Sequence, residues 1–166
     1  MILSTEDFSV EVKEWERNAH TSGDVMPIGT PRIRMAAVLK QINPVDGFLI
    51  HNTAIIGSST PISEGLIMCP YSVITTNCKL GKHLVMNLHS DIGHDCTIGD
   101  YVTLSPSARV SGNCKIGNLV YIGSNAVIKE GVSICDCVTI GAGAVVLTDI
   151  TEGGTYVGVP AKQVTK

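Results

Sequence analysis

Aliphatic side chains recur at every sixth position through most of the chain. Starting at residue 50 and stepping by six, seventeen consecutive positions are aliphatic or Met. Chance placement at 44% hydrophobic content would give such a run about once in a million trials. We call these residues anchors: Ile50, Ile56, Ile62, Met68, Ile74, Leu80, Met86, Ile92, Ile98, Leu104, Val110, Ile116, Ile122, Ile128, Ile134, Ile140 and Val146. An α-helix completes a turn in about 3.6 residues, so residues six apart would not lie on one face of a helix.

A chain that turns a corner every six residues keeps all the anchors inside. Three short strands joined by tight turns make a triangular coil of about eighteen residues, and stacked coils rise by about 4.8 Å. The residues four beyond the anchors are small or apolar, such as Ala54, Cys78 and Val102. The sequence therefore predicts an all-β fold, a left-handed parallel β-helix. An antiparallel sandwich would instead need alternating polarity and hairpin turns at irregular spacing.

Glycine and aromatic content agree with such a narrow coil. The chain has seven aromatic residues (two Phe, four Tyr and one Trp), and a thin triangular interior has little room for rings. We expect glycine to relieve the tight corner where it directly follows an anchor. It does so at Gly57, Gly81, Gly93, Gly99, Gly117, Gly123 and Gly141.

The repeat divides the chain into three parts. Residues 48–147 form the predicted β-helix, and Glu152 in the next anchor position predicts that residues 148–166 are a C-terminal tail folding back over the last coil. Residues 1–47 are predicted to be a short α/β segment, with a strand over 24–28 and a helix over 31–42. The helix start is indicated by Thr30 followed by Pro31, an N-cap and then a first-turn proline.

Composition and charge exclude several classes of function. A net charge of −3 provides no basic surface for nucleic acid. No stretch approaches the 18 or so apolar residues of a membrane span, and Glu6 and Asp7 stand where a signal peptide would be basic and then apolar. We therefore expect a soluble, cytoplasmic protein with no membrane insertion. In that compartment Cys78, Cys96 and Cys114, spaced eighteen apart, are predicted to be stacked, reduced core thiols.

The titratable residues gather in one stretch around His94. His94 stands two residues after an anchor, which places it on a corner, and its stacking neighbours eighteen residues away are Thr76 and Gly112. The missing side chain at Gly112 is expected to leave room for a ligand beyond the imidazole. Asp91 and Asp95 flank His94, and a carboxylate can fix the tautomer of an imidazole and raise its basicity.

The same stretch resembles a known family. The runs below are similar to the hexapeptide acyltransferases of the sialic acid O-acetyltransferase and nucleotide-sugar N-acetyltransferase group. The resemblance covers about residues 48–166, and its first run is the most specific. The runs are Gly93-His94-Asp95-Cys96-Thr97-Ile98-Gly99-Asp100-Tyr101-Val102, Leu104-Ser105-Pro106, Ser111-Gly112-Asn113, Tyr121-Ile122-Gly123-Ser124-Asn125-Ala126-Val127-Ile128, Ile140-Gly141-Ala142-Gly143-Ala144-Val145-Val146 and Gly158-Val159-Pro160-Ala161-Lys162.

The resemblance implies an acetyl-CoA-dependent transfer to an amino or hydroxyl group of a sugar or nucleotide-sugar. By it, His94 is the general base, Asp95 raises its basicity, and Asn87 binds substrate at the same site. Backbone N–H groups would stabilise the tetrahedral oxyanion. The nucleophile belongs to the substrate, so no Ser or Cys triad is required, and no metal is expected.

The resemblance also implies a homotrimer with acetyl-CoA in the groove between neighbouring chains. The pantetheine would lie beside Gly112 and Ser124, and farther along beside Ala142. Thr103 stands where some members have a second His, and is assigned to the cofactor on that basis. Lys162 in the tail would meet the CoA phosphates as a compact cation.

The N-terminal part differs from the family pattern. Members carry a Rossmann-like domain with a glycine-rich loop ahead of the β-helix, whereas residues 1–47 contain no G-x-G-x-x-G run. Residues 27–34 resemble only the last strand and helix of that domain. We therefore interpret residues 1–47 as a remnant of it, which leaves the sugar-nucleotide pocket incomplete or absent.

Two other functions stay open at this stage. His89 and His94 are separated by four residues, as are two zinc ligands in γ-type carbonic anhydrases, which share the coil and hold zinc with three His. The position expected for the third ligand holds Thr53. The other alternative is a β-helix that only provides a scaffold for partners.

Overall fold

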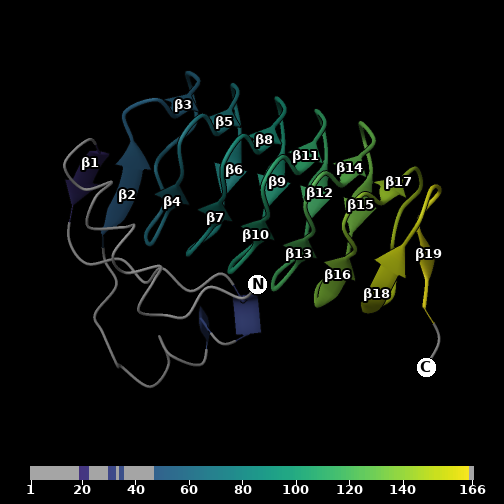
Figure 1. Cartoon of the computed structure of the whole chain (residues 1–166). Helices are drawn as coiled ribbons and strands as arrows, with labels where there is room; N and C mark the ends of the chain where they lie inside the picture. The colour runs from purple at the N-terminus through teal and green to yellow at the C-terminus, as the bar shows by residue number, and fades with distance from the viewer. Residues whose placement is uncertain (1–18, 23–29, 33, 36–46, 165–166) are drawn as a thin grey trace.

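The computed structural model describes residues 19–22, 30–32, 34–35 and 47–164. Most of these wind into stacked coils with three faces, which we call sheets A, B and C (Figure 1). Sheet A contains β1 (Ala19–Ser22), β2 (Phe48–His51), β4 (Ile67–Met68), β7 (Val85–Met86), β10 (Thr103–Leu104), β13 (Tyr121–Ile122), β16 (Val138–Ile140), β18 (Gly154–Val157) and β19 (Lys162–Gln163). Sheet B contains β3 (Ile55–Ile56), β5 (Val73–Ile74), β8 (Asp91–Ile92), β11 (Arg109–Val110), β14 (Val127–Ile128) and β17 (Val145–Val146). Sheet C contains β6 (Lys79–Leu80), β9 (Thr97–Ile98), β12 (Lys115–Ile116) and β15 (Ser133–Ile134).

Each coil stacks on the next in parallel register. Thr103 pairs with Tyr121 in sheet A, and Lys115 pairs with Ser133 in sheet C, so a residue lies beside the one eighteen positions later. The chain passes from sheet A to B to C and back, as the order of strands along each face shows (Figure 1). The predicted fold class, a parallel β-helix built from hexapeptide repeats, is confirmed.

The anchors form the core, with one exception. Almost all of them are buried, or packed against the buried cluster that runs the length of the β-helix. Ile62, predicted to point inward, is instead 48% exposed. Ile62 belongs to the first coil, in which Pro61 stands where Lys79 of the next coil donates its backbone N–H to Cys96. Proline has no N–H, so sheet C begins one coil later, at β6.

The tight corners depend on a different position from the one expected. The residue three after the anchor has a positive φ in coil after coil, for example 58° at Asn77 and 60° at Asp95. Glycines directly after an anchor do not have such φ values. A Cβ on Gly81 would lie 2.4 Å from the backbone carbon of Gly99 in the next coil. The prediction that these glycines relieve the corner is therefore wrong, because their role is to let successive coils approach closely.

The stacked thiols are confirmed. Cys78, Cys96 and Cys114 are buried and lie one coil apart. Each thiol donates to a backbone carbonyl of the following coil, at 3.1 Å from Cys78 to Gly93 and 3.2 Å from Cys96 to Ser111. The thiols therefore point along parallel directions and act as small core residues rather than as disulfide partners.

The coil continues beyond residue 147. Ile150 bridges Ile134 in parallel, and β18 extends sheet A with Tyr156 beside Ile140, both at an offset of sixteen residues instead of eighteen. The last B-to-C corner is two residues shorter, so Ile150 takes the inward position that Glu152 would have held. Only the chain after Val157 turns back, pairing β19 antiparallel to β18.

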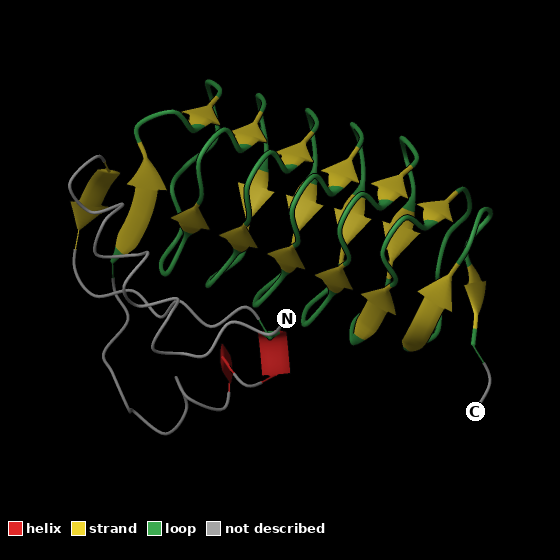
Figure 2. Cartoon of the chain, viewed as in Figure 1, coloured by secondary structure: helices red, strands yellow, loops and turns green. Residues whose placement is uncertain are grey.

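Four described residues of the N-terminal segment are helical. They are residues 31–32 and 34–35 (Figure 2), and the Arg34 backbone N–H donates to the Thr30 carbonyl at 3.0 Å, as in a turn of α-helix. They agree with the start of the predicted 31–42 helix. The rest of that helix and the predicted 24–28 strand lie outside the described residues. Nowhere in the part of the chain that the structure describes is there a helix long and apolar enough to cross a membrane.

Candidate active site

His94 lies on the corner that joins sheet B to sheet C, which we call the B–C corner. It follows β8, and the next residue, Asp95, has the positive φ that turns the chain toward β9. The His94 side chain is 52% exposed and that of Asp95 is 43% exposed. The repeat therefore holds both side chains outside the core, where a substrate can reach them.

The two side chains are joined by a hydrogen bond. His94 Nδ1 lies 2.8 Å from Asp95 Oδ2, while Asn77 of the preceding coil donates to the other oxygen, Oδ1. The pKa of the Asp95 carboxyl is lowered, first by the hydrogen bond from Asn77 and then by that from His94. An ionised Asp95 favours the tautomer with the proton on Nδ1, and Nε2 then carries the lone pair that a general base needs.

Gly112 lies directly against the imidazole. A Cβ on Gly112 would lie 2.7 Å from His94 Cε1 and from Nε2. The prediction that this glycine leaves room for a ligand beyond the ring is therefore corrected, because the ring itself fills that room. Asp91 does not contact His94: it points outward from β8 and pairs with Arg109 at 3.3 Å. Its pKa is raised by burial, which Arg109 only partly offsets.

Four other predicted residues gather at a different edge, the A–B corner that joins sheet A to sheet B. Asn87, Ser124 and Ala142 each follow a sheet A strand by one or two residues. Asn87 Nδ2 donates to the Leu104 carbonyl at 2.8 Å. Lys162 lies at the end of the same edge, because the adjoining Ala161 N–H donates to Val145 of β17. Sheet B therefore separates these residues from His94 and Gly112 within one chain.

Thr103 lies away from both corners, on the outward face of sheet A. It is 1% exposed, and its hydroxyl accepts hydrogen bonds from Arg34 Nη1 and Nη2, each at 3.2 Å. Burial lowers the pKa of Arg34 to about 10. No sequence pattern singles out Arg34, because its partners, Thr103 and the Val102 carbonyl, come from a coil almost seventy residues away.

A second histidine that the sequence analysis did not select is buried. His83 is 2% exposed and stacks on Tyr101 with ring centroids 4.8 Å apart. Burial lowers its pKa below the ordinary 6.5, although Glu64 opposes the effect. Its Nδ1 faces the Cα of Gly65 and has no hydrogen-bond partner. The predictive signal was Gly65 eighteen residues earlier, since a large ring needs a missing side chain beside it.

Within one chain, the described histidines do not come together as zinc ligands. His89 is exposed at the A–B corner and stacks on Tyr71, with ring centroids 5.1 Å apart and planes 9° apart. It thus lies on another edge of the prism from His94. Residues 19–22, 30–32, 34–35 and 47–164 contain no group of three His, Cys, Asp or Glu side chains placed to hold a metal ion.

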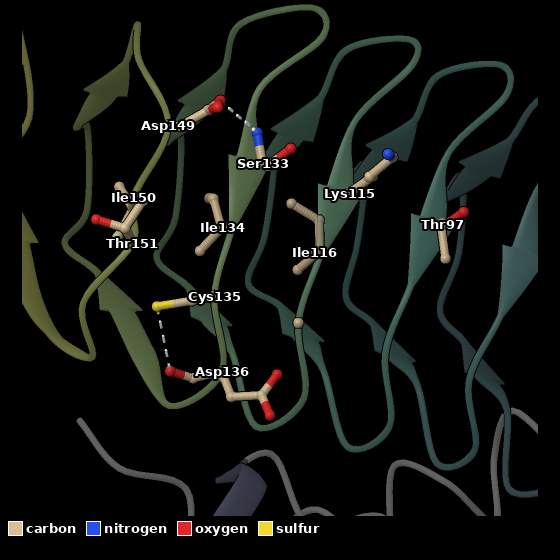
Figure 3. Close-up of a pocket in the computed structure, with 11 residues that line it drawn as sticks. Thr97, Lys115, Ile116, Ser133, Ile134, Cys135, Asp136, Asp149, Ile150 and Thr151 are labelled. Atoms are coloured by element: carbon tan, nitrogen blue, oxygen red, sulfur yellow. Dashed lines mark hydrogen bonds between the residues drawn. The ribbon is translucent and has the colours of Figure 1, made fainter.

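A shallow hollow lies on the outer face of sheet C, near its end (Figure 3). Asp149 accepts the backbone N–H of Ser133 at 2.8 Å. Figure 3 shows this hydrogen bond, with Lys115 and Thr97 on the neighbouring strands. Cys135 lines the hollow and its thiol donates to the Asp136 carbonyl. None of the predicted site residues lines this hollow, so we do not identify it with the chemistry at His94.

A family model and several solved structures resemble the chain. Residues 113–148 match the family described as bacterial transferase hexapeptide (six repeats). The acetyltransferase domain of PglB from Neisseria gonorrhoeae, solved in complex with acetyl coenzyme A, is 29% identical. That match has a TM-score of 0.80 and covers 98% of this chain and 73% of that chain. No curated protein matches.

Two further solved structures are similar over most of the coil. WeeI from Acinetobacter baumannii is 33% identical, with a TM-score of 0.78, over 84% of this chain and 69% of that chain. PerB from Caulobacter crescentus, solved with CoA and GDP-perosamine, is 27% identical, with a TM-score of 0.79, over 85% of this chain and 69% of that chain. The similarity thus extends from the repeat pattern to the whole β-helix.

Proposed function

The chain belongs to the hexapeptide-repeat acyltransferases, and from this membership we propose that it transfers the acetyl group of acetyl-CoA to an amino or hydroxyl group of a sugar or nucleotide-sugar. The observation that carries the proposal is the His94–Asp95 pair, exposed on the B–C corner with Nδ1 of the imidazole held by the carboxylate. PglB bound to acetyl coenzyme A and PerB bound to CoA and GDP-perosamine support the choice of donor and acceptor class.

In the proposed reaction His94 Nε2 takes the proton from the acceptor as its nitrogen or oxygen attacks the thioester carbonyl. Asp95 supports the positive charge that develops on the imidazole. Backbone N–H groups of the coil would stabilise the tetrahedral oxyanion, and the CoA thiolate leaves. No cysteine nucleophile is needed, and Cys78, Cys96 and Cys114 lie in the core where they could not serve as one.

The two separated corners favour a site built from two chains. His94 and Gly112 lie on the B–C corner, whereas Asn87, Ser124 and Ala142 lie on the A–B corner on the other side of sheet B. If three chains assemble with sheet B toward a common axis, the B–C corner of one chain meets the A–B corner of the next. Acetyl-CoA would then lie between neighbouring chains, with the Lys162 end of the A–B corner near its phosphates.

The outward face of sheet B suits such an interface. Four of its six outward residues are apolar: Ile55, which is 59% exposed, and the half-buried Val73, Val127 and Val145. The other two, Asp91 and Arg109, pair with each other. On sheet C the corresponding residues Lys79, Thr97 and Lys115 are polar and exposed. The more apolar face gains more by burial, so we propose a homotrimer closed through sheet B.

The direct test is an acetyl-transfer assay with the purified protein. Acetyl-CoA is mixed with a panel of amino sugars and nucleotide-linked amino sugars, and both CoA release and the mass of the acceptor are followed. Transfer increases the mass of the acceptor by about 42 Da, because an acetyl group replaces one hydrogen. Acceptor-dependent CoA release that is abolished in His94→Ala would support the proposal, and binding of a partner protein without any transfer would favour the scaffold instead.

A further inference from the structure

The residue that holds Asp95 lies one coil away from it. Asn77, Asp95 and Asn113 occupy the same position in successive coils of the B–C corner, three residues after an anchor and with φ between 58° and 60°. Stacking brings the side chain of Asn77 against that of Asp95, and Asn77 Nδ2 donates to Asp95 Oδ1. Asn77, which precedes Asp95 by eighteen residues, is therefore connected to the proposed base, His94, through the single carboxylate of Asp95.

From these contacts we propose that Asn77 is a positioning residue for the acyl transfer: it fixes and charges Asp95, which in turn fixes the tautomer and orientation of His94. This rests on the proposed function. The three side chains are joined by consecutive hydrogen bonds: Asn77 donates to Asp95 Oδ1, and Asp95 Oδ2 lies 2.8 Å from His94 Nδ1. The hydrogen bond of the Asn77 amide goes to Asp95, and that of Asp95 goes to His94, so we assign the effect of Asn77 on the base to Asp95.

The exposure of the pair explains why a second contact is needed. The Asp95 side chain is 43% exposed, so a carboxylate held at one oxygen only would turn about its χ angles and be solvated by water. The hydrogen bond from Asn77 restricts that rotation and stabilises the ionised form, as the lowered pKa of Asp95 indicates. An Asp95 fixed at both oxygens keeps the Nδ1 proton in place between turnovers.

Asn113 offers a matched control. It has the same residue type, a φ of 59° and the same place in the column one coil later, but its amide donates to Glu130 Oε1 at 3.3 Å and not to Asp95. Glycine accepts a positive φ without strain, so Asn77→Gly and Asn113→Gly remove a side chain without straining the corner. A purely structural role of Asn at this position would be removed equally by both substitutions.

The kinetic test measures kcat, and KM for acetyl-CoA, in these variants and in Asp95→Asn. We expect Asn77→Gly to lower kcat by about fivefold to tenfold with KM unchanged, and Asn113→Gly to retain the wild-type kcat. In the Asp95→Asn background, Asn77→Gly should have no further effect, because its only route to His94 is then already altered. An equal loss in both backgrounds, or an equal loss in Asn113→Gly, would overturn the proposal.

A second measurement does not depend on activity. The ¹⁵N chemical shifts of the His94 ring, assigned by comparison with His94→Ala, report which nitrogen carries the proton in the neutral imidazole. We expect the Nδ1–H tautomer to predominate in the wild type and to lose population in Asn77→Gly. Identical shifts in the two proteins would overturn the positioning role. A wild type that shows this tautomer but acetylates no acceptor would refute the proposed function alone.

Discussion

The imidazole of His94 lies over the Cα of Gly112, one coil farther along the prism. A Cβ at residue 112 would lie 2.7 Å from Cε1 and Nε2 of the ring, which is closer than Cβ atoms approach other heavy atoms in proteins. The ring is thus held from one side by the carboxylate of Asp95 and from the other by a backbone that lacks a side chain. The position of the proposed base is therefore set both by its own corner, through Asp95, and by the stacking of the next coil, through Gly112.

Gly112→Ala should therefore displace the base without unfolding the protein. The ring is half exposed and can rotate away from the new methyl group, so the melting temperature should change little. A base displaced by about 1 Å loses about a hundredfold in turnover. Steady-state kinetics and thermal melting together check this. A variant with normal kcat would show that the contact does not position the base.

Removing the base itself should cost more than removing its partner. We expect His94→Ala to lose about 10² to 10⁴ in kcat, the usual contribution of a positioned general base, and Asp95→Asn to lose less. His89→Ala should retain activity, because His89 stacks on Tyr71 and has no role in the proposed reaction. Acetyl-CoA binding, measured by calorimetry, should survive in all three. One zinc per chain, with His89→Ala as inactive as His94→Ala, would contradict this and favour a metal-dependent reaction.

The repeat made the fold predictable, because a period of six leaves almost no other arrangement for the anchors. The exceptions are local: Pro61 removes the N–H that would have tied Ile62 into sheet C, and a coil shortened by two residues brings Ile150 inward in place of Glu152. A fixed spacing of six assumes that no coil is shortened, so it could not anticipate that change of phase.

The candidate site was predictable in part. A spacing of eighteen put His94 beside Gly112, and adjacency put it beside Asp95. The same spacing relates Asn77 to Asp95, but which of several stacked polar side chains bond each other depends on rotamers that sequence does not specify. Arg34 could not be found at all, because its contact with Thr103 joins segments outside the repeat.

Stability should fall on mild acidification because of His83. The pKa of His83 in the folded protein lies below the ordinary 6.5, chiefly through burial. Between these two values the unfolded chain binds a proton that the folded chain does not, so the free energy of unfolding decreases as pH falls below about 6.5. Its charged or titratable neighbours are Glu64, Lys82 and Asp100, together with Arg34 and Tyr101 of the facing elements.

Thermal melting between about pH 7.5 and about pH 5.5 measures how steeply the stability changes with pH. His83→Asn suits the positive φ of 57° at this position and cannot titrate, so its melting temperature should vary less with pH. His89→Asn is the control, since His89 has the same φ of 57° and is exposed. A slope that persists in His83→Asn and disappears in His89→Asn would contradict the assignment.

The six thiols should react in two classes. All are free, with Cys69, Cys78, Cys96 and Cys114 buried, Cys135 half-buried and Cys137 exposed. A disulfide reagent added to the native protein should modify Cys137 first and Cys135 more slowly, because burial raises the pKa of the Cys135 thiol. The other four should react only after unfolding. Fewer than six thiols in the denatured, unreduced protein would show that disulfides form.

The proposed trimer can be tested at its apolar face. Light scattering should give about three times the chain mass of 17.5 kDa. Val127→Asp places a charge on the outward face of sheet B and should dissociate the trimer and abolish activity. Thr139→Asp places the same charge at an exposed position of sheet A and should leave the assembly intact. An active monomer would refute the shared site.

Complementation between inactive variants tests whether the site is shared between chains. His94→Ala inactivates the B–C corner of its own chain, whereas Asn87→Ala damages the A–B corner. In trimers mixed randomly from equal amounts of the two, a site is intact when an Asn87→Ala chain supplies His94 and its neighbour, a His94→Ala chain, supplies Asn87. This arrangement occurs at about one site in four of the whole mixture, so the mixture should recover about a quarter of wild-type activity. If both residues of a site came from one chain, every site in the mixture would lack one of them, and unfolding and refolding the two variants together would restore nothing.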